Sequence, residues 1–503
     1  MRDMYGRFRK PSLDFKTGLG ALVLGFAFAV VFTYQYDPDF WWSLRIGELI
    51  LWMHAVPQHL NWSFLATTHP FISQEWGSEA LYALLWLHGG MIGILVLMAV
   101  VTWVGLLLGW LRMPAQLPLG AKVMAICLTL VAGDATWGPR AQMFTFWGIA
   151  LLLWGLEKHW DSRKLQWGLV LTFWIWGQVH GGFALGLGFW GLYLLGTTLE
   201  AWWRGKSVTG LKGWWLTWIA SGAVVMFNPN GVGVYVYVVR LLHGNAAATL
   251  IQEWQSPNFH DPRMWALIVI FMLLGAAVWS GKWPLGLGMG LLLGGAAFWA
   301  LDAVRNVVDF TIVAMPGVAV GANALWVSLR QSYKHYRESP RTAAPPSREL
   351  LPGLLALGLG LGLMLLLLIP QALAKPNYEF SQAYPVAVVR WVCQHPQTVR
   401  IFGPTGETGW LLAAMDPSGR PGGACSSAQV EAFGEIPLMG AADFTAAANT
   451  QFGYPGSLTQ LQRWRIQAVW TTTSSSLNTI LSLDSHWRKV LQNQGDVIYV
   501  PTS

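Results

Sequence analysis

The chain has 503 residues, of which 54% are hydrophobic and only 11% are charged, and its formal net charge at pH 7 is +7. Glycine (55 residues) and tryptophan (32 residues) are both abundant, as in polytopic α-helical membrane proteins, where helices pack closely and indole rings gather at the membrane interfaces. The positive charge does not indicate nucleic-acid binding, because the basic residues lie in short loops between apolar segments and form no basic face.

A basic tail, residues 1–16, precedes an apolar run from Thr17 to Tyr36. This run is long enough to cross a membrane and longer than the apolar core of a signal peptide, and no small-residue cleavage pattern follows it. We therefore expect an uncleaved first transmembrane helix whose N-terminus is cytoplasmic. Residues 37–90 then form an outer loop.

The outer loop opens with two carboxylates, Asp37 and Asp39, separated by a proline that stiffens the turn. Such a pair can bind a divalent cation such as Mg²⁺ or Mn²⁺ that bridges to phosphate oxygens, or one member can take a proton from an acceptor hydroxyl. The alternative is that both acids have a structural role, either capping the helix end or being hydrated at the membrane surface.

One apolar helical face follows these acids, formed by Trp42, Ile46, Leu49, Ile50 and Met53. Its spacing predicts a short helix in the membrane plane, which would hold the two acids at the depth of the lipid headgroups. Further along the loop are candidates for binding an acceptor or a metal, each of which alone is more simply structural. These candidates are His69, Glu75 and Glu79.

Further apolar runs predict spans at residues 91–111, 120–133, 141–156, 165–179, 183–199, 214–227, 264–280, 285–301, 307–328 and 351–369. With the first run they make about eleven transmembrane helices in a domain that covers residues 17–369. Lys and Arg cluster in alternate loops, which are the cytoplasmic loops if the N-terminus is inside. This pattern puts the loop 37–90 and the segment 228–263 on the outer side of the membrane.

Polar side chains at the outer ends of these spans are candidates for binding a substrate or its phosphate, because ionisable groups so close to hydrocarbon are costly to keep. An arginine there can hold a phosphate through two hydrogen bonds, or can simply extend to lipid headgroups. We expect Val232 to Arg263 to form a second interfacial helix, with Arg240 and His243 one turn apart. The candidates are Arg45, Arg140, His180, Asn228, Arg240, His243 and Arg305.

The polar C-terminal part, residues 370–503, is predicted to be an extracytoplasmic α/β domain. Two of its cysteines, Cys393 and Cys425, can form a disulfide if the outer compartment is oxidising. Short apolar runs predict strands, and amphipathic stretches predict helices between them. The strands are expected at Val399 to Phe402, Gln467 to Thr471 and Asp496 to Val500, and the helices at Pro385 to Gln394 and Leu458 to Arg465.

The string Asp37-Pro38-Asp39-Phe40-Trp41-Trp42, followed by Arg45-Ile46-Gly47-Glu48 and Glu75-Trp76, resembles the first outer loop of bacterial GT-C-like multipass proteins. These proteins are related to the polyprenyl-phosphate-sugar glycosyltransferases. The resemblance covers nearly the whole chain and is more specific for the fold than for the reaction. Its later landmarks are Gly138-Pro139-Arg140-Ala141-Gln142, His180-Gly181-Gly182-Phe183, Asn228-Pro229-Asn230-Gly231, Glu253-Trp254-Gln255-Ser256-Pro257 and Arg305-Asn306.

The resemblance implies a sugar donor carried on a polyprenyl phosphate or diphosphate, and an essential acid at Asp37 or Asp39. The chain departs from the group at Ser43, where a histidine often follows the paired tryptophans, and at Leu60, where an acid is frequent. It also lacks the Trp-Trp-Asp motif of the oligosaccharyltransferases, which disfavours transfer of whole glycans to asparagine.

We therefore predict a GT-C-type membrane glycosyltransferase in which Asp39 or Asp37 is the base of a single inverting displacement, while Arg140, Arg240 and Arg305 stabilise the phosphate. Its partners would be a polyprenyl-phosphate-linked sugar, membrane lipids and an acceptor that is a glycan, a lipid or a protein. Two alternatives stay open. One is a catalytically inactive scaffold in a membrane complex, which the two departures allow, and the other is a transporter of lipid-linked sugars, for which inverted repeats are expected.

Overall fold

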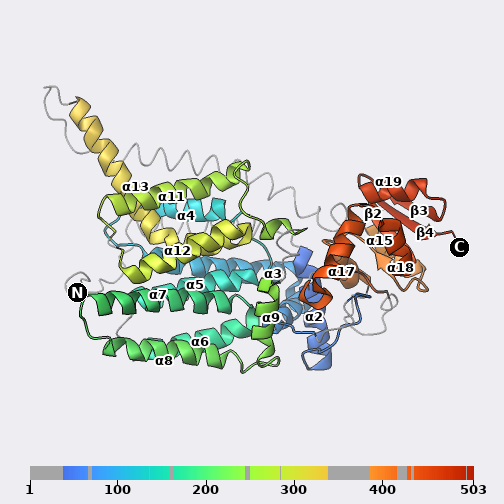
Figure 1. Cartoon of the computed structure of the whole chain (residues 1–503), viewed down its shortest axis with the longest axis horizontal. Coiled ribbons are helices and arrows are strands. Elements are labelled where there is room, and N and C mark those ends of the chain that lie inside the picture. The colour runs from blue at the N-terminus through green and yellow to red at the C-terminus, as the bar shows by residue number, and fades with distance from the viewer. Residues whose placement is uncertain are drawn as a thin grey trace.

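The computed structural model describes residues 38–65, 71–134, 136–158, 162–243, 250–283, 285–337, 386–415, 428–431, 436–493 and 495–502. The first and last expected spans, residues 17–36 and 351–369, lie outside these ranges, as do Asp37, His69 and Cys425. In the described ranges, helices gather in an elongated bundle, and a smaller domain with a sheet lies at one end of it (Figure 1).

The bundle helices coincide with the expected apolar runs wherever those runs fall in the described residues. In Figure 1 most of them lie along the long axis of the molecule, and large buried side chains such as Trp176 and Phe310 fill the space between them. The helices are α3 (Trp76–Arg112), α4 (Leu119–Ala132), α5 (Gln142–Lys158), α6 (Arg163–Val179), α7 (Phe183–Trp203), α8 (Lys212–Val224), α11 (Trp265–Trp279), α12 (Leu287–Asp302) and α13 (Val307–Arg337).

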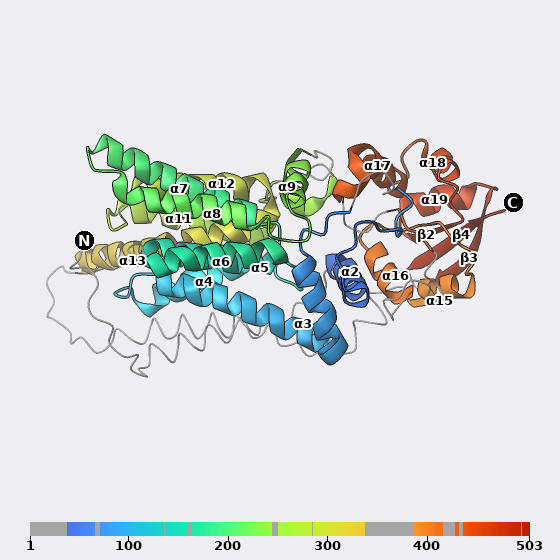
Figure 2. The same cartoon turned by 90° about the horizontal axis from the view of Figure 1, so that it is seen from below.

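Three helices in the described part of the chain are long and apolar enough to cross a membrane, namely Trp76–Arg112, Pro262–Trp279 and Val304–Gln331. The expected total of about eleven spans is not established by the described residues. α3 bends at Gly90, whose φ of 56° is a conformation that glycine adopts without strain. The span expected at residues 91–111 begins directly after this bend (Figure 2).

Helix α2 (Pro38–Met53) forms where the sequence predicts an interfacial helix, but most of its apolar stripe is buried within the protein and is not free to face lipid. Phe40 packs in the core of the bundle. Ile46 and Ile50, which belong to the stripe, are 0% and 6% exposed and pack in a second core shared with the C-terminal domain. The reason is that α16 (Thr408–Met415) of that domain lies against α2. α2 therefore packs between the helix bundle and the C-terminal domain and contacts both.

The segment between α8 and α11 also differs from the prediction. Helix α9 covers only Gly233–His243, whereas residues 251–264 hold the short 3₁₀ turns η3 (Gln252–Trp254) and η4 (Pro262–Met264). Prolines at positions 257 and 262 explain the interruption, because proline lacks the N–H that a continuous helix needs. One interfacial helix over Val232 to Arg263 is therefore wrong.

The described C-terminal domain contains a four-stranded sheet in the order β1-β2-β4-β3. β1 pairs with β2 in parallel, and β4 pairs antiparallel with both β2 and β3. The expected strands and helices coincide with β1, β2, β4, α15 and α18, whereas the sequence does not predict β3, α16, α17 and α19. The elements are α15 (Val386–Gln394), β1 (Ile401–Phe402), α17 (Ile436–Gln451), α18 (Ser457–Arg463), β2 (Ala468–Thr472), α19 (Ser476–Leu483), β3 (Trp487–Asn493) and β4 (Asp496–Pro501).

The cysteines differ in state. Cys393 in α15 is disulfide-bonded, and Cys127 in α4 is free. Since Cys425 lies outside the described residues, the pairing of Cys393 with Cys425 stays a prediction.

Candidate active site

A cavity of about 1100 Å³ lies at the end of the bundle nearest the C-terminal domain. Its walls come from α2, from the turns that precede α5, α7 and α13, from α9 and η3, and from α17. The size suits a small molecule or the headgroup of a lipid. The cavity brings together five of the predicted site residues, Asp39, Glu75, Arg140, His180 and Arg305.

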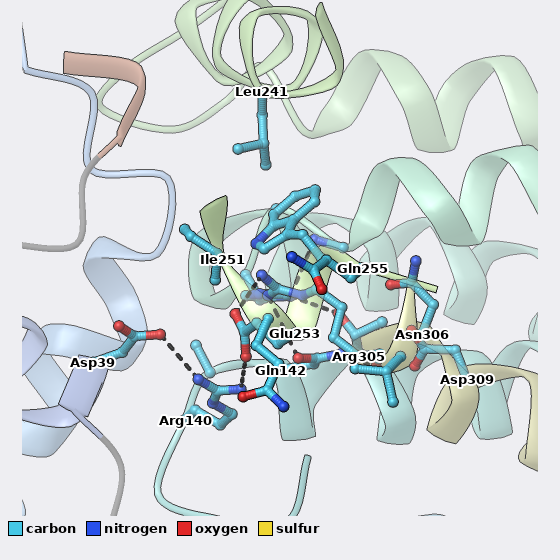
Figure 3. A pocket seen from close by; sticks show the side chains of 18 of the residues that line it. Asp39, Arg140, Gln142, Leu241, Ile251, Glu253, Gln255, Arg305, Asn306 and Asp309 are labelled. Atoms are coloured by element: carbon cyan, nitrogen blue, oxygen red, sulfur yellow. Dashed lines mark hydrogen bonds and ion pairs between the residues drawn. The ribbon is translucent and has the colours of Figure 1, made fainter. Parts of the chain in front are cut away.

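Charged side chains of alternating sign run along this cavity (Figure 3). Arg140 donates from Nη2 to Asp39 Oδ2 at 3.0 Å and from Nη1 to Glu253 Oε2 at 2.6 Å. Arg305 donates from Nη1 to the other oxygen of Glu253, Oε1, at 3.0 Å. A single carboxylate, that of Glu253, thus holds two guanidinium groups next to each other.

Further contacts fix the direction of these arginines. Burial opposes ionisation of Glu253, but Arg140 and Arg305 outweigh it and lower the pKa of this carboxyl to about 2. The guanidinium carbon of Arg305 lies 4.6 Å from the centroid of the Trp254 ring, and Gln142 donates from Nε2 to the Arg305 carbonyl oxygen at 2.8 Å. The two arginines are therefore preorganised to stabilise an anionic group.

A second polar cluster lines the cavity on the side of α2. Glu75 Oε1 accepts a hydrogen bond from Ser43 Oγ at 3.4 Å, and Glu75 Oε2 lies 4.0 Å from His180 Nε2. On the other side of the imidazole ring, Nδ1 accepts from the Gly182 N–H at 3.1 Å and lies 2.6 Å from Thr145 Oγ1. Because Nδ1 is an acceptor, neutral His180 carries its proton on Nε2, the nitrogen that faces Glu75.

Burial leaves this cluster uncharged at neutral pH. The pKa of Glu75 is raised to about 8 by burial and by the negative charge of Asp39. Burial also lowers the pKa of His180 to about 3, and the positive charges of Arg305 and Arg140 act in the same direction. Protonated Glu75 can therefore donate a hydrogen bond, and neutral His180 adds no charge to the cavity.

Another part of the cavity wall is mostly apolar. It comes from one side of α7 and one side of α9, and Figure 3 shows Leu241 of α9 set apart from the charged chain of Asp39, Arg140, Glu253 and Arg305. An amphipathic ligand would find a surface for each of its parts here. The side chains and backbone of this wall belong to Ala184, Leu185, Gly188, Tyr237, Val238, Leu241 and Leu242.

Two predicted site residues of the first loop have structural surroundings instead. The guanidinium of Arg45 is buried, with its carbon 5.6 Å from the centroid of the Trp62 ring. Glu79 is 0% exposed near the start of α3 and accepts a hydrogen bond from Ser73. Neither side chain lines the cavity.

Two predicted site residues of the 228–263 segment, Asn228 and Arg240, are also not brought to the cavity. Asn228 caps its own turn, since its Oδ1 accepts from the Asn230 N–H at 2.7 Å. Arg240 lies on the exposed side of α9, whereas Leu241 lines the cavity. The side chain of His243 lies outside the described part of the chain.

Several cavity residues were not singled out from the sequence, including Glu253, Gln142 and Asp309. Asp309 carried a usable signal, because it is an acid within an apolar run, and such acids are rare in membrane spans unless they face a cavity or a partner. Glu253 and Gln142 lie in the landmarks quoted above but show no feature of their own. Only the pairing with Arg140 and Arg305 reveals them.

The surroundings of Asp39 suit an ion pair better than a metal ion. Its Oδ2 accepts from Arg140, and its Oδ1 accepts from Trp42 Nε1 at 3.4 Å. No group of three or more His, Cys, Asp or Glu side chains that could hold a metal occurs within the described ranges. Asp37 lies outside those ranges, so a cation held by Asp37 and Asp39 stays a prediction.

Solved glycosyltransferases share this arrangement of helices. The arabinofuranosyltransferase AftD from Mycobacteria aligns with a TM-score of 0.56 and 13% identity over 99% of this chain and 40% of its own. The Archaeoglobus fulgidus oligosaccharyltransferase aligns with a TM-score of 0.56 and 11% sequence identity, and the alignment covers 91% of this chain and 70% of that chain. ArnT from Cupriavidus metallidurans aligns with a TM-score of 0.50 and 13% sequence identity, and the alignment covers 96% of this chain and 98% of that chain.

The chain thus spans only 40% of the length of AftD but nearly all of ArnT. No family model and no curated protein sequence matches it. At these identities the likeness concerns the fold, and the long apolar helices agree with it. The chain is a multi-pass membrane protein with the fold of the GT-C glycosyltransferases.

Proposed function

We propose that this chain is a membrane glycosyltransferase that moves a sugar from a polyprenyl-phosphate donor to an acceptor at the outer face of the bacterial inner membrane. The observation that carries the proposal is the cavity of about 1100 Å³, which is lined both by Asp39, Arg140 and Arg305 and by apolar residues of α7 and α9. The GT-C-like fold supports the same reaction class.

The donor has an apolar chain and an anionic phosphate, and the cavity offers a surface for each. The apolar side chains of α7 and α9 suit the first prenyl units. Arg140 and Arg305 suit the phosphate. As the bond between the sugar and the phosphate breaks, its electron pair stays with the phosphate oxygen, and the two fixed guanidinium groups stabilise the growing negative charge.

Asp39 is the proposed base. Its side chain is 42% exposed, so an acceptor hydroxyl can approach it. The carboxylate takes the proton of that hydroxyl while the acceptor oxygen bonds to the anomeric carbon from the side opposite the phosphate, and polyprenyl phosphate leaves. One such displacement inverts the configuration of the sugar. Asp37 remains the alternative base.

The C-terminal domain supplies the wall from which we expect the acceptor to approach. Phe444, Gln451 and Phe452 line the cavity, and Gln451 Oε1 accepts from Thr405 Oγ1 at 2.8 Å. The archaeal oligosaccharyltransferase has been solved with a tethered acceptor peptide, with a TM-score of 0.55 to this chain and 10% identity. The acceptor here is proposed to be a glycan, a lipid or a protein.

The open cavity favours an enzyme over the two alternatives. An inactive scaffold predicts a closed surface beside Asp39, whereas Asp39 lines a large cavity. A transporter predicts polar sites near the middle of broken helices, whereas the chain of charges here lines a cavity at the end of the bundle nearest the C-terminal domain.

The test is transfer of a labelled sugar from its undecaprenyl-phosphate-linked form to membranes of the source organism, with the purified protein in lipid nanodiscs. We expect Asp39→Asn to abolish transfer while the protein stays folded. Asp302→Asn, a substitution of an exposed acid outside the cavity, is the matched control. Full transfer by both Asp39→Asn and Asp37→Asn would overturn the proposal.

The same assay tests the divalent cation. If Mg²⁺ or Mn²⁺ joins Asp37 and Asp39 to the phosphate, EDTA should stop transfer and the added cation should restore it. Transfer that persists in EDTA would mean that Arg140 and Arg305 stabilise the phosphate without a metal.

A further inference from the structure

A buried carboxylate lines the cavity next to α12. Asp309, in the first turn of α13, is 2% exposed, and its Oδ1 has no hydrogen-bond partner among the described residues. In Figure 3 it lies beyond Arg305 and Asn306, at the other end of the view from Asp39. Such a carboxylate is unfavourable in the folded protein unless a partner binds it.

An unpaired donor belongs to the same corner. Trp299 of α12 also lines the cavity, and its buried Nε1 finds no acceptor in the described ranges. Asn306 connects the two helix ends, since its Nδ2 donates to the Trp299 carbonyl oxygen at 3.2 Å and Asp309 follows three residues later. The corner formed by Trp299, Asn306 and Asp309 thus contains one unsatisfied acceptor and one unsatisfied donor.

The chemistry of this corner selects its ligand. A hydroxyl group donates one hydrogen bond and accepts others, so it can satisfy both Asp309 and Trp299. An ammonium group has no acceptor for the indole N–H, and Arg305 nearby disfavours a cation. An ionised phosphate has no donor for the unpaired Oδ1 of Asp309.

We propose that Asp309 and Trp299 bind a hydroxyl group of the sugar that is transferred, which makes this corner the sugar subsite of the donor. The inference rests on the proposed glycosyl transfer. It adds that the donor sugar carries a free hydroxyl at the position that reaches α13, and that Asp309 distinguishes the loaded lipid from the bare lipid.

The test compares the affinities of two kinds of lipid for the protein in nanodiscs. The probes are bare undecaprenyl phosphate and undecaprenyl phosphate loaded with glucose, mannose, galactose or N-acetylglucosamine. We expect Asp309→Ala to weaken binding of the preferred loaded lipid about tenfold, as for a lost buried hydrogen bond, and to leave the bare lipid unchanged. Trp299→Phe should act in the same direction with a smaller effect.

Two further measurements separate binding from a structural role. Monodeoxy versions of the preferred sugar should include one that loses affinity for the wild type and shows no additional loss with Asp309→Ala, because the two changes remove the same contact. Asp309→Ala should also keep or raise thermal stability, since it removes an unsatisfied buried group. Asp302→Asn and Trp279→Phe, at exposed positions outside the cavity, are the controls.

Each outcome decides a claim. If Asp309→Ala and Trp299→Phe bind the loaded lipids like the controls, or weaken the loaded and the bare lipid equally, the sugar subsite is refuted while the glycosyltransferase proposal stands. A wild type that binds bare lipid no less tightly than every loaded lipid also refutes it. If the wild type binds none of the lipids, the proposed function itself fails.

Discussion

Glu253 shows how one side chain organises the others in the cavity. Its two oxygens hold Arg140 and Arg305 at 2.6 and 3.0 Å, so the separation of two positive groups is set by the width of a single carboxylate. Without it, two adjacent guanidinium groups would repel each other and take other directions. Glu253 is therefore a positioning residue for the phosphate-binding arginines.

Glu253→Gln should lower transfer about 10- to 100-fold, because an amide cannot hold both arginines by charge. The loss should appear mainly as weaker use of the donor, and Glu253→Asp should restore part of it. The measurement is the rate of sugar transfer against donor concentration. An unchanged rate would mean that the arginines do not need this carboxylate.

The raised pKa of the Glu75 carboxyl makes the stability of the folded protein depend on pH. This pKa is raised from 4.5 to about 8 in the folded protein, so the folded state keeps a proton that the unfolded chain releases between these values. The stabilisation is complete below pH 4.5 and is lost as the pH rises to about 8. Glu75→Gln, which resembles the protonated carboxyl, should flatten this dependence and raise the melting temperature above pH 8.

Thermal melting from about pH 5 to about pH 9 of the wild type, Glu75→Gln and the control Asp302→Asn measures the effect. The control should retain the wild-type dependence. A Glu75→Gln protein with the same pH dependence as the wild type would show that Glu75 ionises in the folded state as it does in water.

At the scale of elements, α2 depends on close contact with α3. A Cβ added to Gly47 would collide with the backbone carbonyl of Glu79, so Gly47→Ala should push the two helices apart and lower the stability by about 1–3 kcal/mol, as in overpacking. Gly89→Ala, where a Cβ meets open space within α3, is the matched control and should be neutral or stabilising. Equal melting temperatures for the two variants would contradict this account of α2.

Most of the helices and strands could be predicted from the sequence, but their packing partners could not. Apolar runs and their periodicity predict the bundle helices, three strands and α2, because each signal is local. The partner of α2 could not be predicted, since α16 is remote in the sequence and only folding brings it against Ile46. Strand β3 could not be predicted from the sequence, because Arg488 and Lys489 interrupt the apolar alternation in this exposed edge strand.

For the candidate site, single residues could be predicted from the sequence, but the contacts between them could not. Asp39, Arg140, His180 and Arg305 could be predicted as polar groups at the ends of spans, where burial is costly. Their mutual pairing could not, and neither could Glu253, which has no periodic signal and acts only through its partners. Arg240 illustrates the opposite error of inference, because a helix carries it on one side while its neighbours line the cavity on the other.

At the scale of the whole molecule, the proposed orientation puts the N-terminus in the cytoplasm and the C-terminal domain outside. The C-terminal domain contributes both to the cavity wall and to the core around α2. Alkaline phosphatase fused to the C-terminus should therefore be active, and a fluorescent protein fused there and exported in unfolded form should be dark. An inactive phosphatase with a bright fluorescent fusion would reverse the orientation and the side of the reaction.

The central claim is that Asp39, Arg140 and Arg305 surround the reacting group of a polyprenyl-phosphate sugar. The most direct test is a cryo-electron microscopy structure of the protein in nanodiscs with that lipid bound. We predict a phosphate within hydrogen-bond reach of Arg140 or Arg305, the prenyl chain against α7 and α9, and the anomeric carbon facing Asp39. A lipid bound elsewhere, with this cavity left to water, would contradict the account.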